Sequence, residues 1–202
     1  MKRSIIDLHV HTRPYSSCSR LSLREVLNNL DPTIEGLGIT NHDSLDGVPR
    51  YARKGKTKDG ESVLLPGVEI TTIQGHIIAF GITEPPSKHL TPKEVIKIIH
   101  DEGGVAIAAH PFKLGFKFEE MENLEWDAIE INGKIGRREN KQARQLARLL
   151  EIPLVGGSDT HSLKDLNSCV TVFKQEIKTV ADVVHQIQRG LCSASWLGFT
   201  KR

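Results

Sequence analysis

Cysteine is scarce in this chain of 202 residues, which contains only Cys18, Cys169 and Cys192. Their number is odd and no two of them have the spacing of a metal knuckle, so a reducing compartment fits best. The first residues, Met1–Ser4, lead directly into a strand-like segment without the apolar stretch of a signal peptide. We therefore expect a cytoplasmic protein.

Excess charge and long apolar runs are also missing. The formal net charge is +2, which is too small to indicate binding to nucleic acid or to a membrane. No apolar run approaches the roughly 18 residues of a membrane span. With 38% hydrophobic and 26% charged residues, the composition is that of an ordinary globular protein. The length fits one domain, which we expect to span residues 1–202.

Strand-like and helix-like segments alternate along the whole chain. Capping boxes at Ser22–Glu25 and Thr91–Glu94 mark the starts of helices that run to about Leu30 and to about Glu102. The remaining predicted helices are Gly136–Leu150, with Leu146, Leu149 and Leu150 on its buried side, and Thr179–Gln188. The predicted strands are Ile5–Val10, Gly36–Thr40, Ser62–Ile70, His76–Phe80, Val105–Ala109, Trp126–Asn132, Leu154–Gly157 and Cys169–Phe173.

This alternation predicts an α/β protein with a mostly parallel sheet. Too few residues separate Ser62–Ile70 from His76–Phe80 for a crossover helix, so we expect these two strands to be antiparallel. A polar loop at Ser44–Gly60 and the tail after Gly190 show no clear period. If the sheet is closed or nearly closed, it forms a barrel with its functional site at the carboxyl ends of the strands.

The chain has nine histidines, and most of them lie at the ends of apolar runs. In Asp7-Leu8-His9-Val10-His11, residues two apart point to the same side of a strand. Two imidazoles at this spacing can chelate one metal ion. Asp7 could orient one of these imidazoles without binding the metal itself. Two exposed histidines at a strand end would explain the same pattern equally well.

The same kind of placement recurs along the chain. Asp159 and His161 follow a short apolar strand, and His42 and His110 also come directly after apolar runs. Taken alone, each of these residues is also typical of a side chain that is hydrogen-bonded in a loop or in the core. Glu69 ends a strand, where burying it unpaired would be costly without a cation nearby. If the next strand is antiparallel, His76 reaches the same rim, and the joint pattern favours imidazole and carboxylate ligands for Zn, Mn or Fe.

Six motifs in this order, DLHVHT, TNHD, PGVEI, GHIIAFG, AHP and GSDTH, resemble those of the polymerase and histidinol phosphatase (PHP) family of phosphoesterases. The resemblance extends from Asp7 to His161. It implies a distorted seven-stranded β/α barrel with two or three divalent metal ions at its carboxyl end. The implied ligands are His9, His11, Glu69 and Asp159 for one ion, Glu69, His76 and His110 for a second, and His42 and His161 for a third.

Two departures from the family pattern concern the third ion. The family usually has an aspartate shortly after the paired histidines, whereas Arg13–Ser19 contains no carboxylate. Asn41 also stands where the family commonly has an aspartate. Cys18 could replace the missing ligand, or it could simply pack in the loop.

The resemblance implies a hydrolase in which a metal-activated hydroxide attacks phosphorus, with Asp159, His42 and His161 as catalytic residues. The expected substrates are phosphomonoesters or short nucleotide phosphoesters. A PHP-type nuclease acting in the 3′–5′ direction and a non-catalytic PHP module are the alternatives. The lack of a basic tract argues against a long nucleic acid as partner. Candidates for phosphate binding, each of which could also be a solvated surface charge, are Arg13, Lys113, Lys134, Arg137 and Arg138.

Overall fold

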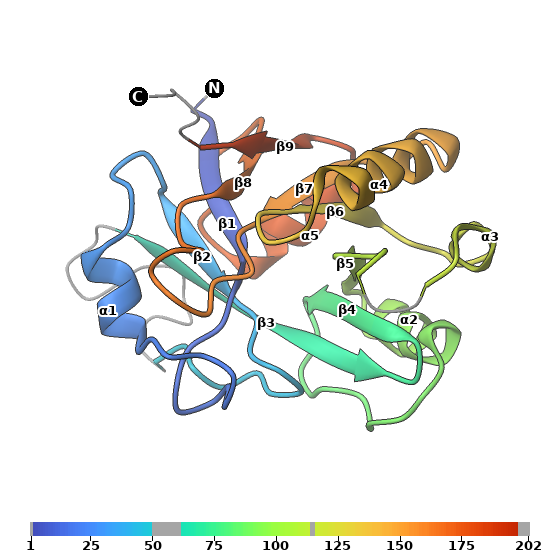
Figure 1. Cartoon of the computed structure of the whole chain (residues 1–202), viewed down its shortest axis with the longest axis horizontal. Coiled ribbons are helices and arrows are strands. Elements are labelled where there is room, and N and C mark those ends of the chain that lie inside the picture. Colours follow the sequence, from blue (N-terminus) through green and yellow to red (C-terminus); the bar gives the residue numbers. More distant parts are fainter. Residues whose placement is uncertain (1, 50–61, 114–115, 198–202) are drawn as a thin grey trace.

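The computed structural model describes residues 2–49, 62–113 and 116–197, which form the helices and strands of Figure 1. The predicted loop Ser44–Gly60 therefore lies partly outside the described residues. The elements are β1 (Ser4–Val10), α1 (Leu23–Asn28), β2 (Gly36–Ile39), β3 (Val63–Thr72), β4 (Gly75–Phe80), α2 (Pro92–Asp101), β5 (Val105–Ala109), α3 (Phe118–Met121), β6 (Ala128–Asn132), α4 (Arg137–Leu149), β7 (Leu154–Gly157), β8 (Cys169–Phe173), α5 (Val180–Gln188) and β9 (Cys192–Trp196).

The strands form one sheet in the order β7-β6-β5-β4-β3-β2-β1-β8-β9. β1, β2 and β3 are parallel to one another, as are β5, β6 and β7. β4 is antiparallel to both β3 and β5, which confirms the predicted hairpin. The segment after β7 returns to β1, where the amide of His11 donates to the carbonyl of Thr160 at 3.1 Å. β1 to β7 thus form a nearly closed barrel, which confirms the predicted fold class.

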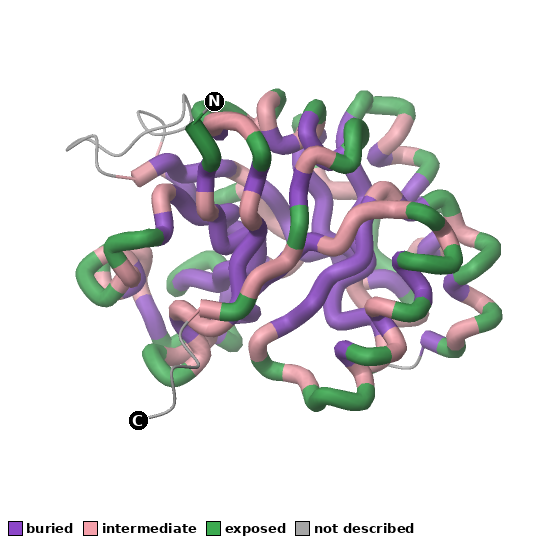
Figure 2. Tube along the Cα trace, turned by 90° about the horizontal axis from the view of Figure 1, so that it is seen from above, coloured by how far each residue is buried: buried purple, intermediate pink, exposed green. Residues whose placement is uncertain are grey.

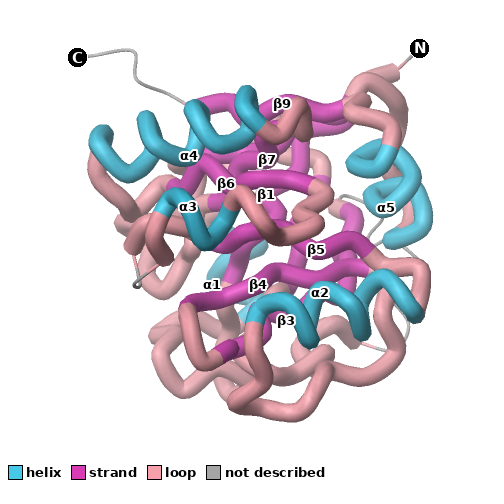
Figure 3. Tube along the Cα trace, turned by 90° about the vertical axis from the view of Figure 1, so that its right-hand side faces the viewer, coloured by secondary structure: helices cyan, strands magenta, loops and turns pink. Residues whose placement is uncertain are grey.

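The side chains of the barrel divide between an interior layer and a layer under the helices. Phe80 of β4 packs with interior neighbours, whereas Ala79 belongs to a cluster that includes residues of α2 and α4. Figure 3 shows α2 and α4 against the outside of the strands, and Figure 2 shows the buried strands beneath an exposed surface. The buried residues at the carboxyl ends of the strands include polar ones, among them His9, His11 and Glu69.

Local sequence signals set the helix starts. Ser22 and Thr91 accept hydrogen bonds from the amides of Glu25 and Glu94, as the capping boxes predict. The predicted burial of Leu149 is wrong, because its side chain is 57% exposed. The buried face of α4 is instead centred on Asn140, Ala143, Leu146 and Ala147. α3 and β9 were not predicted; β9 pairs with β8, and its short polar sequence carries no apolar alternation.

None of the helices in the described ranges has both the length and the apolar character needed to cross a bilayer. The cytoplasmic location expected from the sequence stays a prediction.

The ring of Phe80 packs closely against two glycines, Gly38 of β2 and Gly67 of β3. A methyl group at Gly67 would lie 2.5 Å from Cε1 of Phe80, and one at Gly38 would lie 2.7 Å from its Cζ. Phe80→Ala should therefore lower the free energy of unfolding by roughly 3–5 kcal/mol, because it leaves a cavity in the barrel. Urea unfolding followed by circular dichroism measures this loss.

The same assay tests the contact directly. Gly67→Ala should be destabilising in the wild-type protein and less so in a Phe80→Leu background, because the clashing ring is gone. Ile73→Ala, at a side chain that is 62% exposed, is the control and should change stability by no more than about 0.5 kcal/mol. Equal costs of Gly67→Ala in both backgrounds would contradict this packing.

Candidate metal centre

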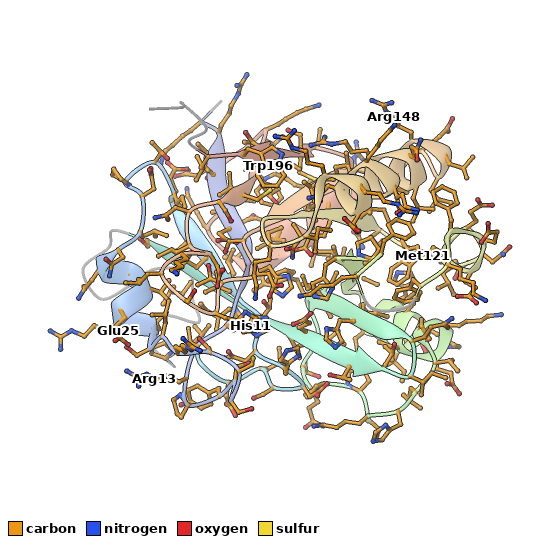
Figure 4. The ribbon with its side chains drawn as sticks, viewed as in Figure 1. His11, Arg13, Glu25, Met121, Arg148 and Trp196 are labelled. Carbon is orange, nitrogen blue, oxygen red and sulfur yellow. The ribbon has the colours of Figure 1, made fainter. Side chains whose placement is uncertain are left out.

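The carboxyl end of the barrel brings together all of the predicted metal ligands. His9 and His11 come from β1, Glu69 from β3 and His76 from β4. The others follow β2, β5 and β7 directly. Figure 4 shows His11 at this end of the barrel, opposite the end where β1 begins. The residues gathered there are His9, His11, His42, Glu69, His76, His110, Asp159 and His161.

Glu69 lies at the centre of this group and its side chain has no exposed surface. Its Oε1 atom lies 2.8 Å from Nδ1 of His76 and 2.9 Å from Nε2 of His110. Its Oε2 atom lies 3.0 Å from Nε2 of His11 and 3.2 Å from Nε2 of His9. The two carboxylate oxygens therefore face two different groups of imidazoles.

Asp159 borders the Oε2 side of Glu69. Its Oδ1 atom lies 3.6 Å from Nε2 of both His9 and His11, and 3.2 Å from Nδ1 of His161. The backbone of Asp159 has a positive φ of 54°, a conformation that non-glycine residues rarely adopt. His110 likewise has a φ of 29°. Both residues follow a strand, and backbone strain of this kind is concentrated at functional sites.

A third group of possible ligands lies beside the first two. The side-chain ligand atoms of His11, Cys18, His42 and His161 all lie within 4.8 Å of one another. The sequence suggested Cys18 as an alternative to the missing aspartate, and the fold brings its thiol to the appropriate histidines. Asn41 takes another role, because its Oδ1 accepts a hydrogen bond of 2.8 Å from the amide of Thr12.

Glu130 is part of the site but was not predicted from the sequence. Its carboxylate is buried, with Oε1 2.8 Å from Nδ1 of His9 and Oε2 accepting a 2.7 Å hydrogen bond from the amide of His110. This contact leaves Nε2 of His9 directed at Glu69. The signal that could have identified it is a lone glutamate within the apolar segment Ala128–Asn132, because burying a charge needs a partner.

Asp7 supports the site through the backbone. Its Oδ1 accepts hydrogen bonds from the amides of His9 at 3.1 Å and Ser158 at 3.0 Å. Burial raises the pKa of this carboxyl to about 6, against the lowering effect of these donors. The expected role of orienting an imidazole is performed instead by Glu130 for His9 and by Ser16, whose Oγ lies 3.1 Å from Nδ1 of His11.

The charges in this cluster strongly affect one another. Burial raises the pKa of Glu69, but His9 and the other imidazoles outweigh it and hold the pKa well below its usual range. Burial lowers the pKa of His9, but the carboxylates of Glu130, Glu69 and Asp159 raise it well above the usual value. Burial lowers the pKa of His11 to about 4. Because only a neutral imidazole is a metal ligand, a metal ion and a proton on His9 exclude each other.

The chemistry of the donor set fits divalent cations. Among the described residues, Oε2 of Glu69 and Nδ1 of His42 are buried without a hydrogen-bond partner and lie 3.4 Å apart. Burying a carboxylate oxygen without a donor is costly unless a cation compensates it. Imidazole nitrogens and carboxylate oxygens are the ligands that divalent transition metals accept.

Two of the candidate phosphate-binding residues lie at the site. Nζ of Lys113 lies 3.2 Å from Oδ2 of Asp159, and Nζ of Lys134 lies 3.8 Å from the same atom. The guanidinium of Arg13 pairs with Glu25 of α1 at 3.1 Å (Figure 4), because the loop after β1 turns toward the capping box of α1. Its role in phosphate binding stays a prediction. The other two arginines lie on α4: Arg137 lines a separate cavity, and Arg138 is exposed.

Comparisons with known proteins bear on the family and the fold of the chain. A family profile described as PHP-associated matches residues 137–192. The uncharacterized protein MJ1587 of Methanocaldococcus jannaschii is 33% identical over 138 residues, which are 62% of this chain and 79% of that protein.

Solved structures share the fold at lower identity. PsfC from Pseudomonas syringae has a TM-score of 0.74 and 19% identity, covering 98% of this chain and 93% of that one. The lesion-specific endonuclease PfuEndoQ from Pyrococcus furiosus has a TM-score of 0.70 and 16% identity, covering 96% of this chain and 58% of that one. A two-domain protein from Bacteroides vulgatus that contains a predicted PHP-like metal-dependent phosphoesterase has a TM-score of 0.70 and 15% identity, with coverage of 97% and 65%.

At these identities the structural likenesses establish the fold alone. The histidine and carboxylate motifs, the PHP-associated segment and the barrel lead to one conclusion. By its fold and by its PHP-associated segment, the chain resembles the PHP-like metal-dependent phosphoesterases.

Proposed function

We propose that this protein is a metal-dependent phosphoesterase that hydrolyses phosphomonoesters or short nucleotide phosphoesters. The observation that carries the proposal is the position of Glu69, whose two oxygens face two separate groups of imidazoles at the carboxyl end of the barrel. A carboxylate in this position is suited to bridge two cations. Paired cations are a common solution for displacement at phosphorus.

The distances support an assignment of ligands to ions. Zn, Mn and Fe suit the mixed imidazole and carboxylate set better than Mg or Ca. The proposed ligands are His9, His11, Glu69 and Asp159 for the first ion, Glu69, His76 and His110 for the second, and His42 and His161 for a third.

Bound divalent cations would supply a hydroxide nucleophile at neutral pH and neutralise the phosphoryl oxygens. The protein's own residues would position the substrate. Lys113 and Lys134 present two ammonium groups on the side of Asp159, where they can donate to further phosphoryl oxygens. Asp159 holds both ammonium groups in place through its Oδ2 atom.

Where no third ion is bound to them, His42 and His161 are the proposed proton donors to the leaving oxygen. Their side chains are 30% and 19% exposed, whereas those of His9 and His11 are fully buried. A leaving group departs toward solvent, so a partly exposed imidazole is better placed to protonate it.

Two other functions remain in competition. A nuclease would use the same centre, and the likeness to an endonuclease fold is compatible with it. Phosphate release from mononucleotides, compared with shortening of a labelled single strand, distinguishes a phosphatase from a nuclease. A non-catalytic module is disfavoured because the full set of candidate ligands converges on one site.

The first test concerns metal content and hydrolysis. Protein purified without chelator should contain more than one equivalent of Zn, Mn or Fe by elemental analysis. His9→Ala and Asp159→Ala should each lower hydrolysis of p-nitrophenyl phosphate by at least about 100-fold, because each removes a ligand. His185→Ala, at an exposed histidine of α5, is the matched control and should retain activity. A wild-type protein that takes up no metal, or full turnover in either ligand variant, would refute the proposal.

A second test concerns the residue that orients His9. Glu130→Gln should weaken metal binding by roughly 10–100-fold in a chelator competition assay, because the neutral amide is a weaker acceptor for Nδ1 of His9. The circular dichroism spectrum should remain that of the wild type. Glu125→Gln, at an exposed glutamate of the same segment, should leave the affinity unchanged. An unchanged affinity in Glu130→Gln would remove Glu130 from the site.

A third test concerns Cys18. We hypothesise that its thiolate completes the third ion's ligands with His42 and His161, which would favour Zn. Cys18→Ser should then lower the metal content by about one ion, and Cys18→Asp should restore it. The Co²⁺-loaded wild type should show a thiolate-to-cobalt absorption band that Cys18→Ser lacks. The same stoichiometry and the same spectrum in both variants would make Cys18 a bystander.

A further inference from the structure

A basic cavity lies along α4, next to the metal centre. It has a volume of about 860 Å³ and is lined by Arg137, Lys141 and Arg144 of α4, by Lys164 after β7, and by Trp196 of β9. On a helix, positions 137, 141 and 144 fall on one face, so the three cations line one wall together. We call this cavity the α4 groove.

No described residue neutralises the cations of the α4 groove. Within the described ranges, none of the four basic side chains forms an ion pair or a side-chain hydrogen bond. The carboxylate of Asp165, which follows Lys164 in the chain, accepts hydrogen bonds from Ser162 and from the amide of His161. Four uncompensated cations at one place in a chain of net charge +2 attract an anion.

Trp196 adds an aromatic surface to the groove. It is 37% exposed, whereas the other tryptophan, Trp126, is 5% exposed and buried in the core. Figure 4 shows Trp196 at β9, and the residue is paired in register with Cys169 of β8. A partly exposed aromatic ring beside cations is the combination that binds a base together with its phosphates.

The groove and the metal centre share the segment that follows β6. Gly133 lines the groove and directly precedes Lys134, whose Nζ lies 3.0 Å from Nδ1 of His161. A methyl group at Gly133 would also lie 3.2 Å from the carbonyl oxygen of Ser158, the residue before Asp159, so the wall of the groove adjoins the backbone that carries a proposed metal ligand. A volume of about 860 Å³ lies within the range of ligand pockets and is much larger than a single phosphate requires.

We propose that the α4 groove binds a short single-stranded nucleic acid segment attached to the phosphate that is hydrolysed. Its phosphates contact Arg137, Lys141, Arg144 and Lys164, and one base stacks on Trp196. This inference rests on the proposed function and narrows its substrates to oligonucleotides. The net charge of the whole chain argued against a long polymer, and a groove of this size suits a segment of a few nucleotides.

Fluorescence anisotropy of a labelled hexathymidylate with phosphorothioate linkages, bound to the full chain as purified, tests the proposal. Trp196→Ala should weaken binding by about tenfold, and Trp196→Phe should restore most of it, because any aromatic ring can stack. The double variant Lys141→Gln/Arg144→Gln should also weaken binding by about tenfold and reduce its salt dependence. Arg148→Gln, at an exposed arginine of α4 outside the groove, is the matched control and should bind like the wild type.

Competition and a metal-ligand variant separate the possible failures. Inorganic pyrophosphate should displace the hexamer far less efficiently than unlabelled hexamer does, and equal displacement would reduce the groove to a simple anion site and overturn the proposal. Wild-type affinity in both groove variants would overturn it as well. His9→Ala should lose hydrolysis of p-nitrophenyl phosphate and still bind the hexamer. If the wild type fails to hydrolyse that ester, the proposed function is refuted. If it hydrolyses the ester but fails to bind the hexamer, only the proposal about the α4 groove is refuted.

Discussion

A carboxylate without access to solvent, that of Glu69, is the feature on which the carboxyl end of this barrel depends. Transfer of a charge into such a place costs several kcal/mol unless partners compensate it. Here the partners are imidazoles from β1 and β4 and from the segments after β2 and β5, each within 3.4 Å of one carboxylate oxygen. One side chain on β3 thus connects strands that lie on both sides of it in the sheet. The histidines are placed by this requirement as much as by any chemistry that they perform.

Closure of the barrel provides the remaining part of the site. The amide of Thr160 donates to the carbonyl of His9 at 3.3 Å, so the segment after β7 is held against the end of β1. This contact places Asp159 beside the paired histidines of the first motif. Asp7 strengthens the junction, since it accepts hydrogen bonds from the amides of both segments. Glu130 connects it to β5 by accepting from the amide of His110. The positive φ angles of His110 and Asp159 are tolerated here because hydrogen bonds fix the backbone around both residues.

The distribution of charge decides what kind of ester such a centre can receive. Negative charge is concentrated in the buried carboxylates, whereas positive charge from Lys113 and Lys134 lies at the rim and continues onto α4. A phosphate group approaching this end therefore meets cations first, and its anionic charge is then matched by any divalent ions held among the imidazoles. The net charge of the chain, +2, conceals this arrangement because the two signs are separated in space.

The sequence by itself determined most of the local structure and named the candidate ligands. Capping boxes fixed the helix starts, and the order of strands and helices predicted the barrel, because these signals depend on neighbours in the chain. The resemblance of six motifs to those of the PHP family named His9, Glu69, Asp159 and their partners as candidate ligands. Only the tertiary structure decided which of two oxygens each imidazole faces, that Glu130 supports His9, and that Arg13 turns away to Glu25. It also gathered the cations of α4 with Trp196 from the far end of the chain. Most of those outcomes depend on strand register and barrel closure, which bring together residues as far as 121 positions apart and leave no local pattern in the sequence.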